Sequence, residues 1–356
     1  MSRLNRTDRY HLCYLFVHNI NEDIFDGLSH VLEHSLLIPT DIGLDFDGYG
    51  YTCANHVWLY FGSEKLETII EVDRQIMNCE IITDENVNRA KRQVEEEILR
   101  LRELTIQNRK MINFVTEQRI KSFAIGDLHQ IKQINRDDIT RWFENRKYQN
   151  QVFRFIFKDA NNMIVSTPLN DLKREGDNIS CKPGISGGED SFMLLNKCSG
   201  VCTIQLFLKL PTFVLKEKLI EKAIFEFCIQ KKIEEEFGIV IEIYDKFFDN
   251  KERFAMLAFK WNAPTDYLDV IKNIRLAINR ISLDDFLRYK DEFKQYSNIW
   301  MSPNESNTEI MNGIKNFILY GTPKIQREDL TYIDQINYSM FPRDFITKSP
   351  LKVIIS

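Results

Sequence analysis

The sequence lacks several features that would point to particular classes of protein. Its seven cysteines form no C-x-x-C pair, so we expect neither a thiolate metal site nor a disulfide-exchange motif, and we expect reduced thiols. No uncharged apolar run approaches the roughly 18 residues that a membrane-spanning helix needs. The first residues do not have the pattern of a signal or transit peptide, so a cytoplasmic location is the expectation.

An excess of positive charge is also missing. The chain has 47 basic and 52 acidic residues, a net charge of -5, and both signs are spread along it. This excludes a broad cationic face and argues against nucleic-acid binding. What the chain does have is length and apolar content, because 44% of its 356 residues are hydrophobic. That is enough for a large core and for two or three compact units.

Strand and helix patterns alternate in both halves of the chain. A stretch rich in Asn, Asp, Pro, Gly and Ser separates the halves and is typical of a linker. We therefore predict an α+β fold of two similar domains, 1–165 and 190–356, each an antiparallel-rich sheet packed with helices and joined by a linker at 166–189. In the first half the predicted strands are Tyr10–Val17 and Gly50–Phe61, and the predicted helices are Leu28–Leu37, Glu64–Met77 and Asp84 to about Leu104. In the second half the predicted strands are Val201–Leu210, Ile239–Phe248 and Arg253–Trp261, and helices are predicted at Leu215–Phe237 and over most of 265–320.

One predicted helix carries the residues that point to chemistry. His30 and His34 are four residues apart, a spacing that places two imidazoles on one helix face, where both can bind a single zinc ion. Glu33 lies beside that face, and its carboxylate can take a proton from a water molecule on the metal. A catalytic zinc ion usually has a third protein ligand, for which the cluster of Glu95, Glu96 and Glu97 is the obvious source. Two helical histidines that meet by accident are the alternative.

These residues resemble a known family of peptidases. The run from Gly27 to His34, GLSHVLEH, resembles the G-x-x-H-x-x-E-H signature of the inverzincins, the M16 family of insulinase, pitrilysin and mitochondrial processing peptidase. Glu22, Tyr51-Thr52 with His56, and the run from Arg92 to Ile98 are also similar to family segments. The resemblance implies a zinc cofactor with ligands His30, His34 and Glu97, Glu96 being the next candidate, and Glu33 as the catalytic base.

The resemblance also implies an assembly. Family members close two two-domain halves around an unfolded peptide, one half with zinc and the other with an Arg/Tyr pair that holds the substrate. The chain matches one half, and the positions of that pair are occupied by Glu234 and Ile241. An auxiliary glutamate of the family is replaced by Ala90, and the segment from Ser35 to Gly48 is shorter than in the family. We therefore expect a heterodimer with a homologous subunit that supplies the clamp.

The substrate is expected to be a peptide that pairs with a strand edge near Gly48. Main-chain pairing gives affinity with little demand on sequence. The substrate-binding residues implied by the resemblance are Tyr49, Gly50, Tyr51 and Thr52, with Tyr49 in place of the asparagine of the family. The predicted function is a zinc metalloendopeptidase subunit, with removal of leader peptides as one use implied by small split relatives. The alternative is a non-catalytic subunit that keeps the fold for peptide binding or scaffolding.

Overall fold

The computed structural model of the chain describes residues 9–18, 23–37, 46–53, 55–116, 124–158, 163–166, 190–195, 201–210, 216–247, 253–262, 267–300, 307–320, 325, 327–342 and 348–355. The chain divides into two compact units. The first comprises Met1–Asn113, Gln118–Asp177 and Glu305–Lys315, and the second comprises Phe114–Glu117, Asn178–Asn304 and Asn316–Ser356. Apart from Ser166, the predicted linker 166–189 lies outside the described residues, as does Glu22, so the domain boundary stays a prediction.

The first unit is built on a five-stranded antiparallel sheet with the order β2-β3-β1-β4-β5. The central strand β1 has the sequence YHLCYLFV and pairs with β3 along one edge and with β4 along the other. Six of its eight residues are buried, and most of the residues on each of its faces are apolar. The strands are β1 (Tyr10–Val17), β2 (Asp47–Thr52), β3 (His56–Ser63), β4 (Val152–Phe157) and β5 (Met163–Ser166).

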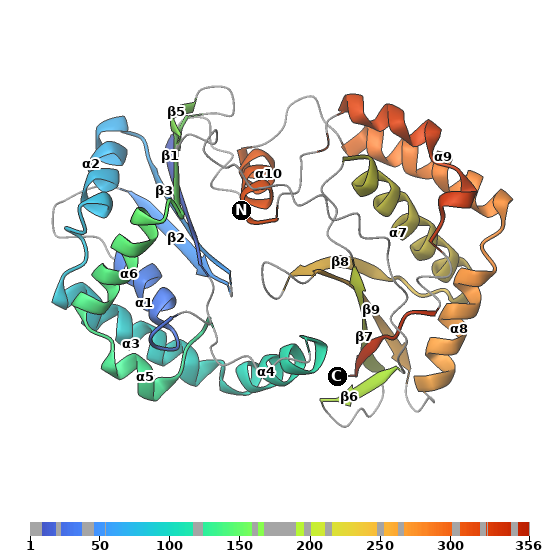
Figure 1. The fold of residues 1–356 in the computed structure, drawn as a ribbon, viewed down its shortest axis with the longest axis horizontal. Coiled ribbons are helices and arrows are strands. Elements are labelled where there is room, and N and C mark those ends of the chain that lie inside the picture. Colours follow the sequence, from blue (N-terminus) through green and yellow to red (C-terminus); the bar gives the residue numbers. More distant parts are fainter. Residues whose placement is uncertain are drawn as a thin grey trace. The chain divides into compact units, whose positions relative to one another are not determined.

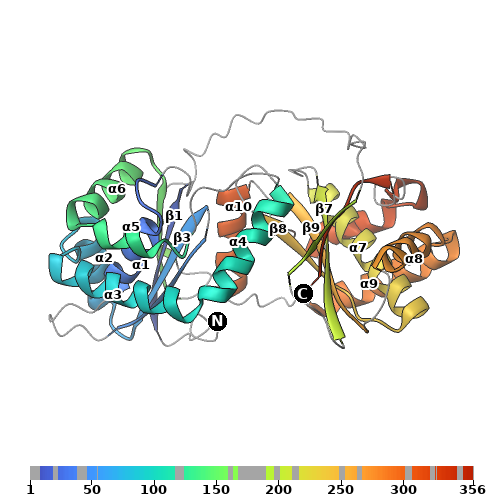
Figure 2. The same cartoon turned by 90° about the horizontal axis from the view of Figure 1, so that it is seen from below.

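Helices cover one face of this sheet. Figure 1 shows α1, α2, α3 and α6 on the same side of β1 and β3, and Figure 2 shows the same arrangement from below. The alternate residues Leu12, Tyr14 and Phe16 of β1 point into the core under these helices, where they meet Val31 and Leu32 of α1. The helices are α1 (Leu28–Leu37), α2 (Leu66–Met77), α3 (Asp84–Arg100), α4 (Arg102–Thr116), α5 (Leu128–Gln133) and α6 (Arg136–Tyr148).

Two predicted elements in this unit have different bounds in the structure. The single strand predicted from Gly50 to Phe61 is wrong, because β2 and β3 form a hairpin whose turn is closed by a hydrogen bond from the Cys53 amide to the His56 carbonyl. The charged helix predicted from Asp84 to about Leu104 ends at Arg100, and Leu101 separates it from α4. The start of α3 is fixed by the Thr83 side chain, which accepts a hydrogen bond from the Asn86 amide.

The second unit has its own five-stranded sheet, with the order β6-β10-β7-β9-β8. β6 and β10 are parallel, and the other pairings are antiparallel. Helices α7, α8 and α9 cover one face of it (Figure 2), and their apolar residues form the core with β7 and β9. The strands are β6 (Ser191–Leu194), β7 (Val201–Leu210), β8 (Glu242–Phe247), β9 (Arg253–Asn262) and β10 (Lys352–Ile355). The helices are α7 (Lys216–Phe237), α8 (Tyr267–Asn279) and α9 (Leu283–Trp300), with the 3-10 helices η4 (Arg327–Gln335) and η5 (Tyr338–Met340). The helix α10 (Asn307–Tyr320) is divided between the units, because its residues up to Lys315 belong to the first unit and the rest to the second.

Each unit thus packs helices on one face of an antiparallel-rich sheet, which confirms the predicted α+β fold class. Within the described part of the chain, no helix is long and apolar enough to cross a membrane.

Candidate metal centre

Two imidazoles and a carboxylate meet between helices α1 and α3. His30 and His34 lie one turn apart on α1, with ring centroids 4.9 Å apart and Nε2 atoms 3.2 Å apart. Glu97 of α3 faces both, with Oε2 3.4 Å from His30 Nε2 and Oε1 3.6 Å from His34 Nε2. Among the described residues this is the one group of three His, Cys, Asp or Glu side chains close enough to hold a metal ion.

Each histidine is anchored through its other ring nitrogen. His30 Nδ1 lies 3.2 Å from the Ile125 carbonyl oxygen, and His34 Nδ1 lies 3.3 Å from Oε1 of Gln93 on α3. Both partners are oxygen acceptors, so the Nδ1 atoms carry the ring protons and donate these hydrogen bonds. In a neutral imidazole the Nε2 atom then has a free lone pair, and in both rings that lone pair is directed to the shared space beside Glu97.

The donor set fits a zinc ion. Burial lowers the pKa of His30, and the adjacent His34 adds to this effect, so the neutral form of His30 is favoured. Two imidazole nitrogens and a carboxylate that face one another are stabilised by a cation. Ligand atoms about 2.0 to 2.1 Å from a tetrahedral zinc ion are about 3.3 Å apart. The two Nε2 atoms are 3.2 Å apart, and they lie 3.4 and 3.6 Å from different oxygens of the Glu97 carboxylate. The set of two imidazoles and one carboxylate leaves a fourth position open.

Glu33 lies next to these three residues without belonging to the ligand group. Its side chain is buried, and its Oε2 accepts a 2.6 Å hydrogen bond from Thr52 Oγ1 of strand β2. Burial raises the pKa of Glu33 to about 7, the Thr52 hydrogen bond opposes this shift, and the negative charge of Glu97 adds to it. A carboxylate with a pKa in this range is suited to accept and return protons near neutral pH.

Gly27 sets the start of helix α1. Its φ angle is +92°, a conformation that favours glycine, and a Cβ atom at this position would lie 2.7 Å from the Cα atom of Gly126, whose φ is also positive at +94°. The close approach of these two glycines brings the chain at Ile125 next to α1. The Ile125 carbonyl can then reach His30. The close packing against Gly126 therefore explains why position 27, at the start of the GLSHVLEH run, is a glycine.

The predicted substrate-binding residues lie on β2, which forms one edge of the first sheet. Gly50 and Thr52 face the metal-binding helix, because a Cβ atom on Gly50 would lie 2.9 Å from Glu33 Cγ, and Thr52 donates to Glu33. Tyr49 and Tyr51 point to the opposite face of the sheet. There the ring of Tyr49 packs against that of Tyr60 at a tilt of 36°, with centroids 4.7 Å apart.

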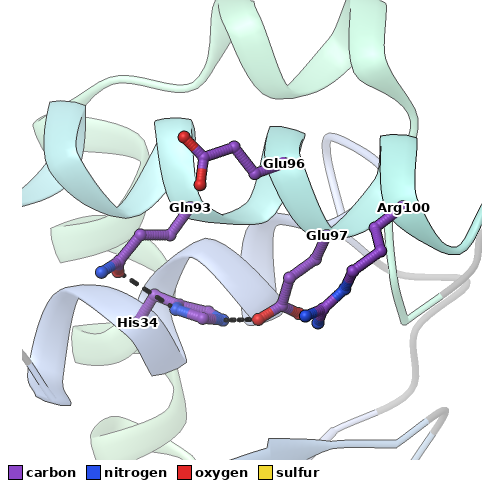
Figure 3. A pocket seen from close by; sticks show the side chains of 5 residues that line it. All are labelled: His34, Gln93, Glu96, Glu97 and Arg100. Atoms are coloured by element: carbon purple, nitrogen blue, oxygen red, sulfur yellow. Dashed lines mark hydrogen bonds and ion pairs between the residues drawn. The ribbon is translucent and has the colours of Figure 1, made fainter.

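A pocket of about 290 Å³ opens beside the metal group. Figure 3 shows its lining residues, of which Gln93, Glu97 and Arg100 follow one face of α3 at a spacing of four and three residues. His34 projects from α1 toward this face. Glu96 also lines the pocket, but its carboxylate points away from His34 and Glu97. Of the two candidates for the third ligand, Glu97 is the one that lies beside the histidines.

The remaining positions named from the family pattern occupy ordinary surroundings. Ala90, at the place of the auxiliary glutamate, is fully buried in the first core. Glu234 is exposed near the end of α7, and Ile241 is fully buried in the second core. Neither supplies a clamp of the Arg/Tyr kind.

Three contributions to the site are not predicted from the sequence: those of Gln93, of the Ile125 carbonyl, and of Thr52 as a partner of Glu33 rather than as a substrate-binding residue. Gln93 precedes Glu97 by four residues, and this helical spacing is a signal that could have identified it. The role of Thr52 as a partner of Glu33 requires the register of β2 against α1, which the sequence does not provide. The contact of the Ile125 carbonyl with His30 is made by the main chain, so the side chain at position 125 does not reveal it. The following residue, Gly126, is the nearest hint in the sequence.

The comparisons with known proteins identify the fold. No protein-family model matches the sequence, and neither does any curated protein. Solved structures do match. A protein described as an M16-like peptidase from Alicyclobacillus acidocaldarius is 12% identical over 98% of this chain and 92% of its own, with a TM-score of 0.64. The inactive M16 peptidase domain from Pseudomonas fluorescens is 10% identical over 98% and 92%, with a TM-score of 0.62. The periplasmic protease PqqL from Escherichia coli is 13% identical with a TM-score of 0.69, and the match covers 98% of this chain but only 44% of that protein.

The chain therefore has the fold of an M16-peptidase half. At 10 to 13% identity this similarity establishes the fold alone, and the three neighbours include an inactive domain.

Proposed function

We propose that the chain is the zinc-bearing subunit of an M16-type metalloendopeptidase that cleaves short or unfolded peptides. The observation that supports this most strongly is the meeting of two Nε2 lone pairs and the Glu97 carboxylate within 3.2 to 3.6 Å. His30, His34 and Glu97 would hold the ion, and Glu33 is the base. A bound zinc ion supplies Lewis acidity, which lowers the pKa of water and polarises a peptide carbonyl.

The residues of the chain supply the proton transfer. Glu33 accepts a proton from the attacking water and then delivers it to the nitrogen of the departing amine. Its buried position excludes competing solvent, and its pKa of about 7 allows both directions of transfer. Thr52 fixes the orientation of the Glu33 carboxylate through the 2.6 Å hydrogen bond. The Nδ1 hydrogen bonds to Ile125 and Gln93 hold both imidazoles in the tautomer that binds metal.

The edge strand β2 supports peptide binding by strand addition. A substrate backbone paired with Tyr49, Gly50, Tyr51 and Thr52 runs past Glu33, because Gly50 and Thr52 contact this side chain. Main-chain pairing demands an extended, unfolded substrate and little specific sequence. Tyr49 in place of the asparagine of the family is expected to change which side chains are accepted near the cleaved bond.

A homologous partner subunit completes the proposed enzyme. The positions of the family clamp hold Glu234 and Ile241, so a second copy of this chain would not supply an arginine and a tyrosine there. We therefore propose a heterodimer whose other member carries the clamp, and leader-peptide removal is one use that such a pair would serve. Full peptidase activity of the purified chain as a monomer would contradict this assembly.

A non-catalytic peptide-binding or scaffold subunit is the second candidate. The match to an inactive M16 domain favours it. The presence of His30, Glu33, His34 and Glu97 in one compact group favours the enzyme.

Replacing Glu33 by glutamine separates the two candidates. Zinc content and cleavage of unstructured fluorogenic peptides are measured for the chain, alone and with its partner, and for Glu33→Gln. If the chain is an enzyme, both proteins should contain about one zinc ion per chain, because the ligands remain in the variant. The variant should lose at least 100-fold in turnover, because its base is removed. Glu95→Gln on α3 is the matched control. Equal turnover in wild type and Glu33→Gln would contradict the mechanism, whereas peptide binding without cleavage by the wild type would favour the scaffold.

A further inference from the structure

One arginine lies in the pocket beside the metal group. Arg100 is in the last turn of α3, three residues after Glu97, and its guanidinium extends on the same side of the helix as Glu97 and His34 (Figure 3). It is the one basic side chain, imidazoles apart, among the five residues that line this 290 Å³ pocket.

The charges around Arg100 leave its guanidinium available. Glu97 is turned to the two histidines and is assigned to the metal, and Glu96 points away from the pocket centre. Although both glutamates lie within one helical turn, the described residues form no ion pair with Arg100. Other surface arginines of the chain do pair under similar conditions, as Arg74 does with Glu71 and Glu80 at 2.6 Å.

We propose that Arg100 selects substrates that carry a carboxylate close to the cleaved peptide bond. This inference rests on the proposed function and names the substrate class for the same site. The guanidinium presents two parallel N–H donors, the geometry that binds a carboxylate with two hydrogen bonds. A positive charge beside the metal ligands favours an anionic group in the pocket and disfavours a cationic one.

The carboxylate has two chemical sources. An aspartate or glutamate side chain next to the cleaved bond supplies one, and the free C-terminus of a peptide cut near its end supplies the other. Peptide pairs distinguish them: one pair differs by Glu or Gln beside the cleaved bond, and the other differs by a free or amidated C-terminus. A preference in the first pair identifies a side chain, and a preference in the second identifies the terminal carboxylate.

The test compares Arg100→Gln with wild type on these pairs. A hydrogen-bonded charge pair contributes about 1.5 to 3 kcal/mol, so the wild type should prefer the carboxylate peptide by about 10- to 100-fold in kcat/KM. In Arg100→Gln this ratio of kcat/KM values should fall to about one. The fall should come from a higher KM for the carboxylate peptide, with kcat unchanged. Arg92→Gln removes the same charge from an exposed position of α3 outside the pocket and should keep the ratio.

Binding gives a second readout that does not require turnover. The same peptides are titrated into zinc-loaded Glu33→Gln and into Glu33→Gln with Arg100→Gln, and the second protein should lose the preference. If no peptide is cleaved by the wild type but this binding preference is present and depends on Arg100, the proposed activity fails, and the part of the inference that stands is that Arg100 binds a peptide carboxylate beside the metal group. A wild-type protein without a preference would overturn the inference. So would an Arg100→Gln variant that loses zinc affinity and keeps the preference, because Arg100 would then position Glu97.

Discussion

Thr52 and Glu33 connect the edge strand to the metal-binding helix, through a hydrogen bond of 2.6 Å from Thr52 Oγ1 to Glu33 Oε2. The strand proposed to bind the peptide and the carboxylate proposed to move the proton are therefore held in one register. Because Thr52 is the neighbour that opposes the raised pKa of Glu33, the same bond also limits how far burial shifts that carboxyl group.

Removing the Thr52 hydroxyl should lower turnover. In Thr52→Val the Glu33 carboxylate loses the partner that orients it, and a hydrogen bond to a charged group contributes about 1.5 to 3 kcal/mol, or about 10- to 100-fold in kcat. Zinc content should be unchanged, since Thr52 does not contact the ligand group. Thr52→Ser keeps the hydroxyl and should retain most of the activity. A Thr52→Val variant with wild-type kcat would show that Glu33 is oriented by other contacts.

Gly50→Ala should impair both stability and turnover. A Cβ atom at position 50 would lie 2.7 Å from Leu59 Cδ2 and 2.9 Å from Glu33 Cγ, so the strand or the base must move. Overpacking of this kind costs about 1 to 3 kcal/mol, measured as a change in the free energy of unfolding. Gly48→Ala on the same strand is the control, because its Cβ would meet the end of Leu37 at 3.1 Å and no catalytic group. Equal effects of the two substitutions on kcat would contradict a special role for Gly50.

The sequence predicts the parts of the site that depend on local spacing. His30 and His34 are four residues apart in a short apolar run, and the structure has this run as helix α1 with both rings on one face. The strands β1, β7 and β9 are likewise predicted nearly to the residue, because apolar and β-branched side chains predominate in each.

Tertiary relationships are what the sequence does not provide. The turn at Cys53 interrupts a pattern that reads as one strand, because apolar residues continue on both sides of a short hairpin. The strand β10 has only four residues and is stabilised by pairing with β6 and β7, which lie far away in the sequence. The contacts of Ile125 with His30 and of Thr52 with Glu33 join segments 95 and 19 residues apart, which no local pattern encodes.

Gln93 should strengthen zinc binding without contacting the ion. It accepts the Nδ1–H hydrogen bond of His34, and loss of such an outer partner typically weakens metal affinity by about 10- to 100-fold. Gln93→Leu should show this loss in a competition titration with a chelator. Asn88→Leu replaces an exposed amide of the same helix and should leave the affinity unchanged. If Gln93→Leu binds zinc as tightly as the wild type, the tautomer of His34 does not depend on Gln93.

Acid should destabilise the first unit through two buried histidines. Burial lowers the pKa of His18 and of His56 from 6.5 to about 3, so the folded state stays neutral while the unfolded state takes up protons. Their stabilising contribution is therefore present above pH 6.5 and is lost as the pH falls toward 3, by at most about 1.4 kcal/mol per pH unit for each histidine. Two buried carboxyl groups oppose this loss: Glu33, whose pKa burial raises to about 7, opposes it between pH 7 and 4.5, and Asp23, whose pKa burial raises to about 6, opposes it between pH 6 and 3.8. The contribution of His18 is therefore isolated by comparing His18→Gln with the wild type.

Denaturant unfolding at pH 7, 6 and 5 in the presence of a chelator measures this dependence without a contribution from metal release. In His18→Gln the unfolding free energy should fall less steeply with decreasing pH, because up to one proton fewer is taken up on unfolding. His129→Gln, at an exposed position, should keep the slope of the wild type. Identical slopes for all three proteins would show that His18 does not titrate as its burial requires.

The most direct test of the metal site is the zinc affinity of the purified chain and of two ligand variants, measured by competition with a chelator. The wild type should bind about one zinc ion. His34→Ala and Glu97→Gln should each weaken binding by more than the roughly 100-fold expected for an outer partner, whereas Glu96→Gln should bind zinc as the wild type does. A wild-type chain that binds no zinc, or a Glu97→Gln variant that binds it equally well, would contradict a metal centre formed by His30, His34 and Glu97.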